Sequence, residues 1–177
     1  DNVVDEVESS ELLKRMARIC EESLDNRVAA MECWERLLTQ QPTHPEALQV
    51  LAPYYESEGR WTDFVEIKEA QLDPDDGQYT EGLVRLSHIY SEHLDDDSKA
   101  LERVLSALNS MPTRVDLLQP AMRYASTSGR FEELYEACTY LVDQVTDEEL
   151  AYLRVVADVG AEKLERYEEV VPYFERI

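Results

Sequence analysis

The chain has 177 residues, of which 44% are hydrophobic and 32% are charged, and its formal net charge is −22. It is too apolar for an intrinsically disordered chain, and no apolar run approaches the roughly 20 residues of a membrane-spanning helix. Because so acidic a surface repels phosphate backbones and anionic lipids, we expect no nucleic-acid binding and no membrane insertion.

The three cysteines, Cys20, Cys33 and Cys138, include no CxxC pair and are odd in number. Their spacing predicts neither a disulfide framework nor a zinc site, so we expect reduced thiols on apolar helix faces. No signal peptide is visible and the first residue is Asp1 rather than Met, which suggests a processed product or an excised piece. The compartment is not determined by the sequence, although a soluble cytoplasmic protein is favoured.

Residues 1–9 form an acidic N-terminal extension, either a helix that continues into the next element or a frayed end. From Ser10, a plausible N-cap, apolar residues recur at intervals of three and four, which predicts an amphipathic helix that ends at Asp25-Asn26. The residues expected to face inward on this helix are Leu13, Met16, Ala17, Cys20 and Leu24.

Three further helices are predicted before the first long loop. The second is ended by Pro42, the third is opened by His44-Pro45 and stopped by Gly59 in a left-handed conformation, and the fourth begins near Trp61. After an Asp- and Gly-containing loop, helices are expected over 80–94, 100–111, 115–128, 131–145, 148–164 and 167–177.

The chain repeats itself with a fixed offset of 70 residues, so that Glu11 matches Glu81 and Pro42 matches Pro112. A fixed period of this kind is the signature of a repeat architecture. The sequence therefore predicts an all-α fold in which residues 10–177 form five antiparallel helical hairpins of about 35 residues each.

Several of these helices carry residues that resemble the tetratricopeptide repeat (TPR) family. The patterns Leu48-x-x-Leu51-Ala52-x-x-Tyr55 and Leu83-x-x-Leu86-Ser87-x-x-Tyr90 resemble its first-helix signature, W-x₂-L-G-x₂-Y, and Ala30-x₃-Trp34 followed by Pro42 resembles its second-helix signature. The resemblance implies a right-handed α-solenoid whose first helices line a concave groove.

The chain departs from the TPR pattern in places. Leu replaces the signature Trp, Ala or Ser replaces the Gly, and Phe64 and Leu134 stand where the second helix of alternate hairpins should carry a small residue. The true repeating unit is therefore expected to be a pair of hairpins. The related half-a-TPR repeats of RNA-processing scaffolds are a near neighbour, but the net charge argues against RNA contact.

Catalytic and metal-binding motifs are lacking in the sequence. It contains no G-x-S-x-G, no phosphate-binding loop and no H-E-x-x-H. His88 and Glu92 share a helix face but supply only two ligands, and the loop Asp73–Gly77 lacks the spacing of a calcium loop. We therefore expect no enzyme, no cofactor and no metal, and we interpret the aromatic residues at helical spacing as core.

The resemblance implies a non-catalytic scaffold that binds a partner protein, as a peptide or helix, in the concave groove. The alternative is a regulatory repeat domain that contacts a catalytic or assembly domain of the same longer chain. The expected groove residues lie just off the apolar stripes of the first helices: Lys14, Arg18, Gln49, His88, Gln119, Arg123 and Arg154. The competing interpretation of the cations among them is that they neutralise acidic neighbours on their own helices.

The C-terminal end is predicted to be uncapped. In the repeat, Phe174 and Ile177 match Trp34 and Leu37, which should pack against a following helix. A solenoid needs a polar terminal cap, so we expect the chain to be part of a longer repeat array. We also expect either lower stability at this end or self-association through it.

Overall fold

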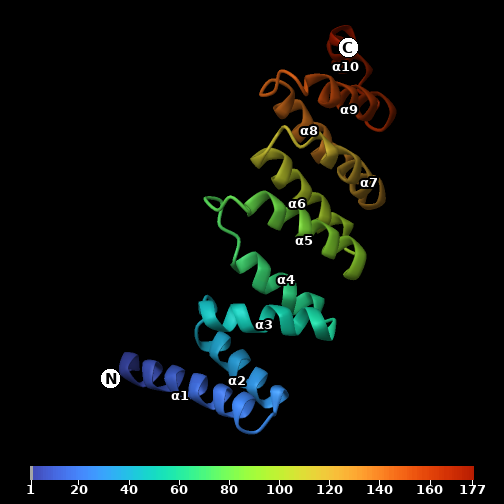
Figure 1. Cartoon of the computed structure of the whole chain (residues 1–177). Coiled ribbons are helices and arrows are strands. Elements are labelled where there is room, and N and C mark those ends of the chain that lie inside the picture. The colour runs from blue at the N-terminus through green and yellow to red at the C-terminus, as the bar shows by residue number, and fades with distance from the viewer. Residues whose placement is uncertain (1) are drawn as a thin grey trace. The chain divides into compact units, whose positions relative to one another are not determined.

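The computed structural model describes residues 2–177, and within them the fold is all-α with no strand. Ten α-helices follow one another as five hairpins (Figure 1). They fall into two compact units, residues 1–71 and 72–177. None of the helices in the described part of the chain is both long enough and apolar enough to cross a membrane.

Unit 1 contains the first two hairpins, and its helices pack in sequence, α1 on α2, α2 on α3 and α3 on α4. Their bounds are α1 Asn2–Glu22, α2 Arg27–Gln40, α3 Pro45–Glu58 and α4 Trp61–Ala70. The apolar faces of α2 and α3 lie inward, since Ala30, Leu37 and Leu51 are fully buried and Trp34 is 2% exposed. Their burial removes apolar area from water, which is the main stabilising contribution to each hairpin.

The first helix matches one of the two alternatives given for residues 1–9, a helix that continues into the next element, because α1 begins at Asn2 and runs without a break into Ser10. The expectation that Ser10 caps a helix is wrong, since Ser10 is buried in the middle of α1. Only Leu13 and Ala17 of the expected stripe are buried, whereas Met16 and Leu24 are exposed. Among the described residues, α2 is the one helix that makes more than a few contacts with α1. As a result, only a narrow strip of the α1 surface is covered.

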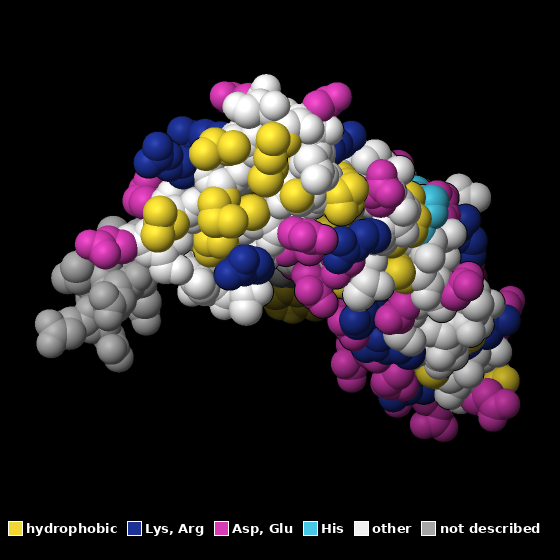
Figure 2. Space-filling view, turned by 90° about the horizontal axis from the view of Figure 1, so that it is seen from below, with side chains coloured by type: hydrophobic (Ala, Val, Ile, Leu, Met, Phe, Trp, Pro, Cys, Tyr) yellow, Lys and Arg dark blue, Asp and Glu magenta, His cyan; other side chains and the backbone are white. Residues whose placement is uncertain are grey.

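Part of the α1 surface that no helix covers is apolar. Leu12, Met16 and Ile19 are 59%, 48% and 45% exposed, and their spacing places them on one side of the helix. Figure 2, which views the molecule from the side of α1, shows apolar side chains gathered there.

Unit 2 contains three hairpins. Their helices are α5 Tyr79–His93, α6 Asp97–Ser110, α7 Leu118–Ser128, α8 Phe131–Val142, α9 Glu149–Glu162 and α10 Tyr167–Arg176, with a short 3-10 helix, η1, over Val115–Leu117. Each helix packs on the next, and α6 packs in addition on α8. Unit 2 thus has a contact between the second helices of successive hairpins.

The backbone repeats with the same 70-residue offset as the sequence. Gly59 adopts the left-handed conformation predicted for it, with φ of 68°, and its equivalent Gly129 does the same, with φ of 74°. Three acidic residues, Asp25, Asp95 and Glu165, also have positive φ, at 47°, 51° and 55°. Since left-handed backbone disfavours L-residues other than Gly, its recurrence at equivalent positions supports the pair of hairpins as the repeating unit.

The turns that follow these acidic residues are capped in two of the three copies. Asn26 accepts a hydrogen bond from the Ala29 amide at 3.1 Å, and Asp96 accepts one from the Lys99 amide at 3.0 Å. Each of these side chains thus satisfies one of the free backbone amides at the start of its helix. In the third copy Arg166 takes the capping position and pairs instead with Glu132.

The three cysteines are free thiols on helices, as predicted. Cys33 and Cys138 are buried and Cys20 is half-buried. Burial raises the pKa of the Cys138 thiol to about 12, which keeps it protonated and unreactive near neutral pH.

Candidate binding site

The acidic and histidine side chains do not assemble into a metal centre in the part of the chain that the structure describes. Among those residues, no group of three or more His, Cys, Asp or Glu side chains is placed to hold a metal ion. His88 and Glu92 do face each other on α5, with Nδ1 and Oε1 3.8 Å apart, as the spacing predicted. The pair offers two ligands at most, so it is an exposed polar contact.

The predicted groove residues of unit 1 lie on α1 and α3. Lys14 donates a hydrogen bond to Glu11 one turn away at 2.8 Å, and Arg18 reaches across to Glu46 on α3, also at 2.8 Å. The Arg18 bridge is about half exposed, so it contributes little to stability and mainly fixes the side chains. Gln49 is exposed on α3.

The predicted groove residues of unit 2 are less engaged. His88, Gln119, Arg123 and Arg154 are exposed on α5, α7 and α9. Arg123 lies over the ring of Tyr124, with its guanidinium carbon 4.9 Å from the ring centre. Within the described residues neither Arg123 nor Arg154 has an ion-pair partner. Neutralisation of an acidic neighbour on the same helix therefore accounts for Lys14, whereas Arg18 pairs with a residue of another helix.

An arginine and a histidine exchange places between the two copies. Arg18 and His44 of the first copy correspond to His88 and Arg114 of the second. Arg18 pairs with Glu46 in the first copy, whereas Arg114 pairs with Glu81 at 2.5 Å and with Asp116 at 2.9 Å in the second. In each copy one arginine bridge therefore connects the two hairpins. The arginine comes from the first hairpin in the first copy and from the segment that leads into the second hairpin in the second copy.

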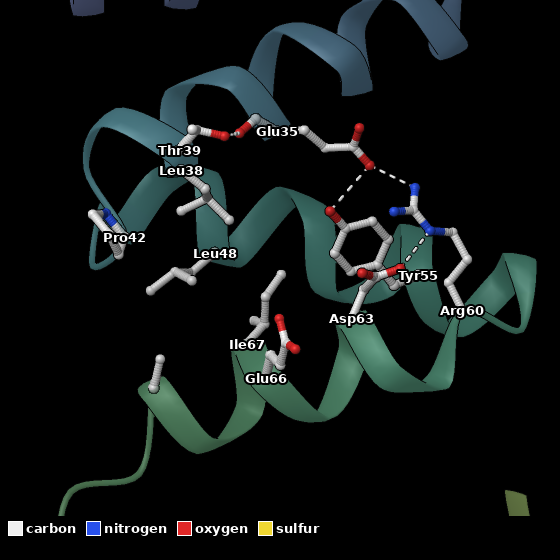
Figure 3. Close-up of a pocket in the computed structure, with 11 residues that line it drawn as sticks. Glu35, Leu38, Thr39, Pro42, Leu48, Tyr55, Arg60, Asp63, Glu66 and Ile67 are labelled. Atoms are coloured by element: carbon white, nitrogen blue, oxygen red, sulfur yellow. Dashed lines mark hydrogen bonds and ion pairs between the residues drawn. The ribbon is translucent and has the colours of Figure 1, made fainter. Parts of the chain in front are cut away.

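Unit 1 also contains a pocket that the sequence did not predict. It has a volume of about 450 Å³ and is lined by residues of α2, α3 and α4 (Figure 3). Its apolar lining consists of Leu38, Pro42, Leu48, Ile67 and Ala70. Its size falls in the range of roughly 300–1,000 Å³ that is typical of ligand pockets.

The rim of the pocket is a connected polar cluster. The Tyr55 hydroxyl donates to Glu35 at 3.0 Å, and Arg60 donates to Glu35 at 2.5 Å and to Asp63 at 2.6 Å (Figure 3). The guanidinium of Arg60 also lies 4.3 Å from the centre of the Tyr55 ring. These contacts fix the tyrosine ring between α2 and α4.

The cluster sets the protonation of its members. Burial, and then the Glu35 carboxylate, raise the pKa of the Tyr55 hydroxyl, so it remains a hydrogen-bond donor. The hydrogen bond to Asp63, and then that to Glu35, raise the pKa of Arg60, which stays charged. The remaining carboxylate on the rim, Glu66, is exposed and has no partner within the described residues.

The equivalent region of unit 2 is closed. Ala125 stands at the position of Tyr55 and is fully buried, and Leu108, the equivalent of the half-buried Leu38, is also fully buried. Arg130, equivalent to Arg60, bonds Glu133 and also reaches Glu102 on α6 at 2.9 Å. A small residue on the first helix thus allows the second helices α6 and α8 to pack together.

The pocket escapes prediction because Tyr55 has the spacing of a core aromatic, and it is indeed buried at 6% exposure. A signal is present in the sequence, since a tyrosine in one copy matches an alanine in the other. So large a difference in side-chain volume at one position predicts that the two helices flanking it lie further apart in the copy with tyrosine.

Comparisons with known proteins identify no relative by sequence, since neither a protein family nor a curated protein matches the chain. Among solved structures it is similar to the MamA protein, with 16% identity, a TM-score of 0.42 and coverage of 95% of this chain and 89% of that one. It is also similar to TPR-like repeats of a kinesin light chain from Podosopora anserina, with 17% identity, a TM-score of 0.44 and coverage of 95% and 90%. A point variant of those repeats gives 16% identity, a TM-score of 0.45 and coverage of 96% and 91%.

Proposed function

We propose that this chain is a non-catalytic scaffold that binds a partner protein through the first helices of its hairpins. The observation that carries the proposal is that Arg123 and Arg154 are exposed and unpaired with any acidic side chain of the described residues. In a chain with a net charge of −22, both guanidinium groups are exposed and have no ion-pair partner among the described residues. Arginine in this state is available for forked contacts to a carboxylate.

The partner is proposed to present an internal segment or a helix with acidic side chains. Gln119, one turn from Arg123 on α7, can add a hydrogen bond to such a segment. In unit 1 the cations predicted to bind a partner, Lys14 and Arg18, are held by Glu11 and Glu46, so unit 2 supplies the principal contact.

The test begins with a photo-crosslinking amino acid at Gln119, introduced in the source cell, and identification of the protein it captures. Arg123→Glu combined with Arg154→Glu should then weaken binding of that protein at least tenfold, about 1.4 kcal/mol. Arg27→Glu combined with Arg36→Glu makes the same charge change on α2 and should have little effect. Unchanged affinity in a folded Arg123/Arg154 variant would refute the site.

The same experiment separates the alternative function. If the crosslink joins Gln119 to another part of the same polypeptide, the chain is a regulatory domain that contacts its own catalytic or assembly domain.

A second contact is proposed at α10. Tyr167, Val171, Phe174 and Ile177 are between 48% and 63% exposed, whereas Met31, Trp34 and Leu37, equivalent to the last three, are at most 3% exposed. A face of this kind favours self-association. Sedimentation equilibrium should show concentration-dependent mass that Phe174→Gln lowers and that Tyr140→Gln, at another exposed aromatic, leaves unchanged.

A further inference from the structure

The pocket of unit 1 lies between the second helices of that unit and does not include the residues of unit 1 predicted to bind a partner. It is formed by α2 and α4 over α3, and Lys14, Arg18 and Gln49 do not line it. It is therefore a separate place on the molecule, and a ligand bound in it would be independent of the partner proposed for the first helices.

The apolar lining of the pocket is suited to apolar side chains of a ligand. Among its members, Leu48 and Ile67 are buried and Leu38 is half-buried. Its volume of about 450 Å³ is about three times that of the roughly 150 Å³ apolar cavity that holds a benzene molecule. The space is thus large enough for a few side chains from one face of a helix, but not for the helix itself.

The rim gives the pocket a negative charge. Three carboxylates, Glu35, Asp63 and Glu66, line it against the single cation Arg60. Arg60 is already shared between Glu35 and Asp63, and these two carboxylates hold it at 2.5 and 2.6 Å. Glu66 is left exposed at the mouth on α4, without a partner within the described residues.

We propose that this pocket binds an amphipathic helix of a partner protein, which inserts apolar side chains between α2 and α4 and places a lysine or arginine against Glu66. The apolar floor selects leucine-like anchors spaced three or four residues apart. The charge of the rim selects basic flanks and disfavours acidic ones. A helix is the expected form of the segment because its backbone groups are already hydrogen-bonded, and residues 2–177 offer no strand edge to pair with an extended peptide.

The copy in unit 2 provides an internal control for this site. Glu136 and Asn109 correspond to Glu66 and Thr39 and are likewise exposed, but the helices that carry them, α8 and α6, pack together. Substitutions at these positions change the same residue types or charges without a pocket to affect.

The test uses two synthetic helical peptides of about 18 residues, a length at which an isolated helix becomes stable enough to study. One carries leucines at i, i+3, i+4 and i+7 with lysine flanks, and the other has glutamate in place of lysine. Titration of the isotope-labelled chain with the lysine peptide should shift the amide signals of Thr39, Leu48 and Ile67. The glutamate peptide should not shift them.

Two exposed substitutions then test the site, with thermal unfolding as the check that each variant is folded. Glu66→Lys should weaken the lysine peptide at least about fivefold because it replaces attraction by repulsion at the mouth. Thr39→Trp should abolish binding because the indole covers the opening. Glu136→Lys and Asn109→Trp should leave the affinity unchanged, as should Arg123→Glu with Arg154→Glu.

Each contrary result has a definite meaning. No amide shift with the lysine peptide up to about 1 mM, a weakening by Glu136→Lys equal to that by Glu66→Lys, or equal binding of the glutamate peptide would each overturn the proposal. The second result would show general attraction to an acidic chain. If the chain instead dimerises and Thr39→Trp returns it to a monomer, the occupant is a second copy and the proposed partner is wrong.

Discussion

The two copies of the repeat in residues 26–71 and 96–141 differ most where the second helices face each other. In unit 1, Tyr55 rises from α3 between α2 and α4, and the space beside it is a pocket. In unit 2, Ala125 takes this position, and α6 packs on α8. The arginine after the left-handed glycine is present in both copies and bonds an acidic residue three positions on, Asp63 or Glu133.

This difference teaches that one side chain on the middle helix can set the distance between its two neighbours. Protein interiors are close-packed, so neighbouring helices move together beside a small residue such as Ala125. A large residue such as Tyr55 keeps them apart. Tyr55 is held at its hydroxyl, which donates a hydrogen bond to Glu35, and on one face of its ring, over which Arg60 lies. Substitutions at four places would break or sharpen the comparison, beginning with the largest expected effect.

Replacing Tyr55 with alanine should remove the residue that separates α2 from α4. We expect a loss of about 3 kcal/mol in the free energy of unfolding, because a large buried ring is deleted together with its hydrogen bond. Urea unfolding measures this loss. Tyr54→Ala, at the half-buried neighbouring ring, should cost less, and equal costs at the two positions would show that Tyr55 has no special role.

The reverse change, Ala125→Tyr, should force a ring into a fully buried site. Overpacking of this kind costs about 2 kcal/mol and should separate α6 from α8. Hydrogen exchange should become faster along α8. Ala70→Tyr introduces the same ring at an exposed position, which is occupied by Tyr140 in the other copy, and should leave exchange unchanged.

The left-handed glycines should behave alike in both copies. Gly129→Val is expected to cost about 1.5 kcal/mol from backbone strain alone, since no atom lies within 4 Å of an added Cβ. Gly59→Val should cost the same within error, and Gly77→Val, where the same space is open without the left-handed backbone, should cost little. A melting temperature equal to the parent's for Gly129→Val would contradict the assigned conformation.

The arginine bridge of the second copy should make a small contribution that depends on pH. The hydrogen bond from Arg114 lowers the pKa of Asp116 below its ordinary value. The contribution is therefore present above the unfolded-state pKa of about 3.9 and is lost as the pH falls through the lower folded-state value. Because Asp116 is 60% exposed, we expect well under 1 kcal/mol.

Asp116→Asn provides the measurement. The difference in unfolding free energy between parent and variant should shrink as the pH is lowered from 7 to 3. A difference that stays constant over this range would show that the Asp116 charge contributes nothing.

Much of the fold could be predicted from the sequence because it depends on local chemistry that the chain repeats. Gly59 acts within a few residues of its own position and ends α3 in the predicted left-handed conformation, and Gly129 does the same for α7. The faces of the terminal helices were harder to predict. Met16 has the spacing of a core residue but is 48% exposed, because periodicity gives the apolar side of a helix and not whether a neighbour covers it.

The candidate site was predicted only in part. That Arg123 and Arg154 lie on exposed helix faces follows from their spacing off the apolar stripes. The pocket could not be predicted in the same way, because it depends on the distance between α2 and α4, which are far apart in the sequence. Apolar residues such as Leu48 and Ile67 have the same pattern whether the space above them is filled or open.

The recurrence of a left-handed acidic residue at Asp25, Asp95 and Glu165 also bears on how a gene for such a chain could change length. Each of these positions enters a new block with the same backbone turn, so a crossover between any two of them would join segments that already fit. Losing or gaining a whole block at such a joint would leave every local turn intact. The predicted product is a shorter or longer array that folds without compensating mutations. Each block in it would have a pocket where it carries tyrosine at the position of Tyr55, and no pocket where it carries alanine, as at Ala125.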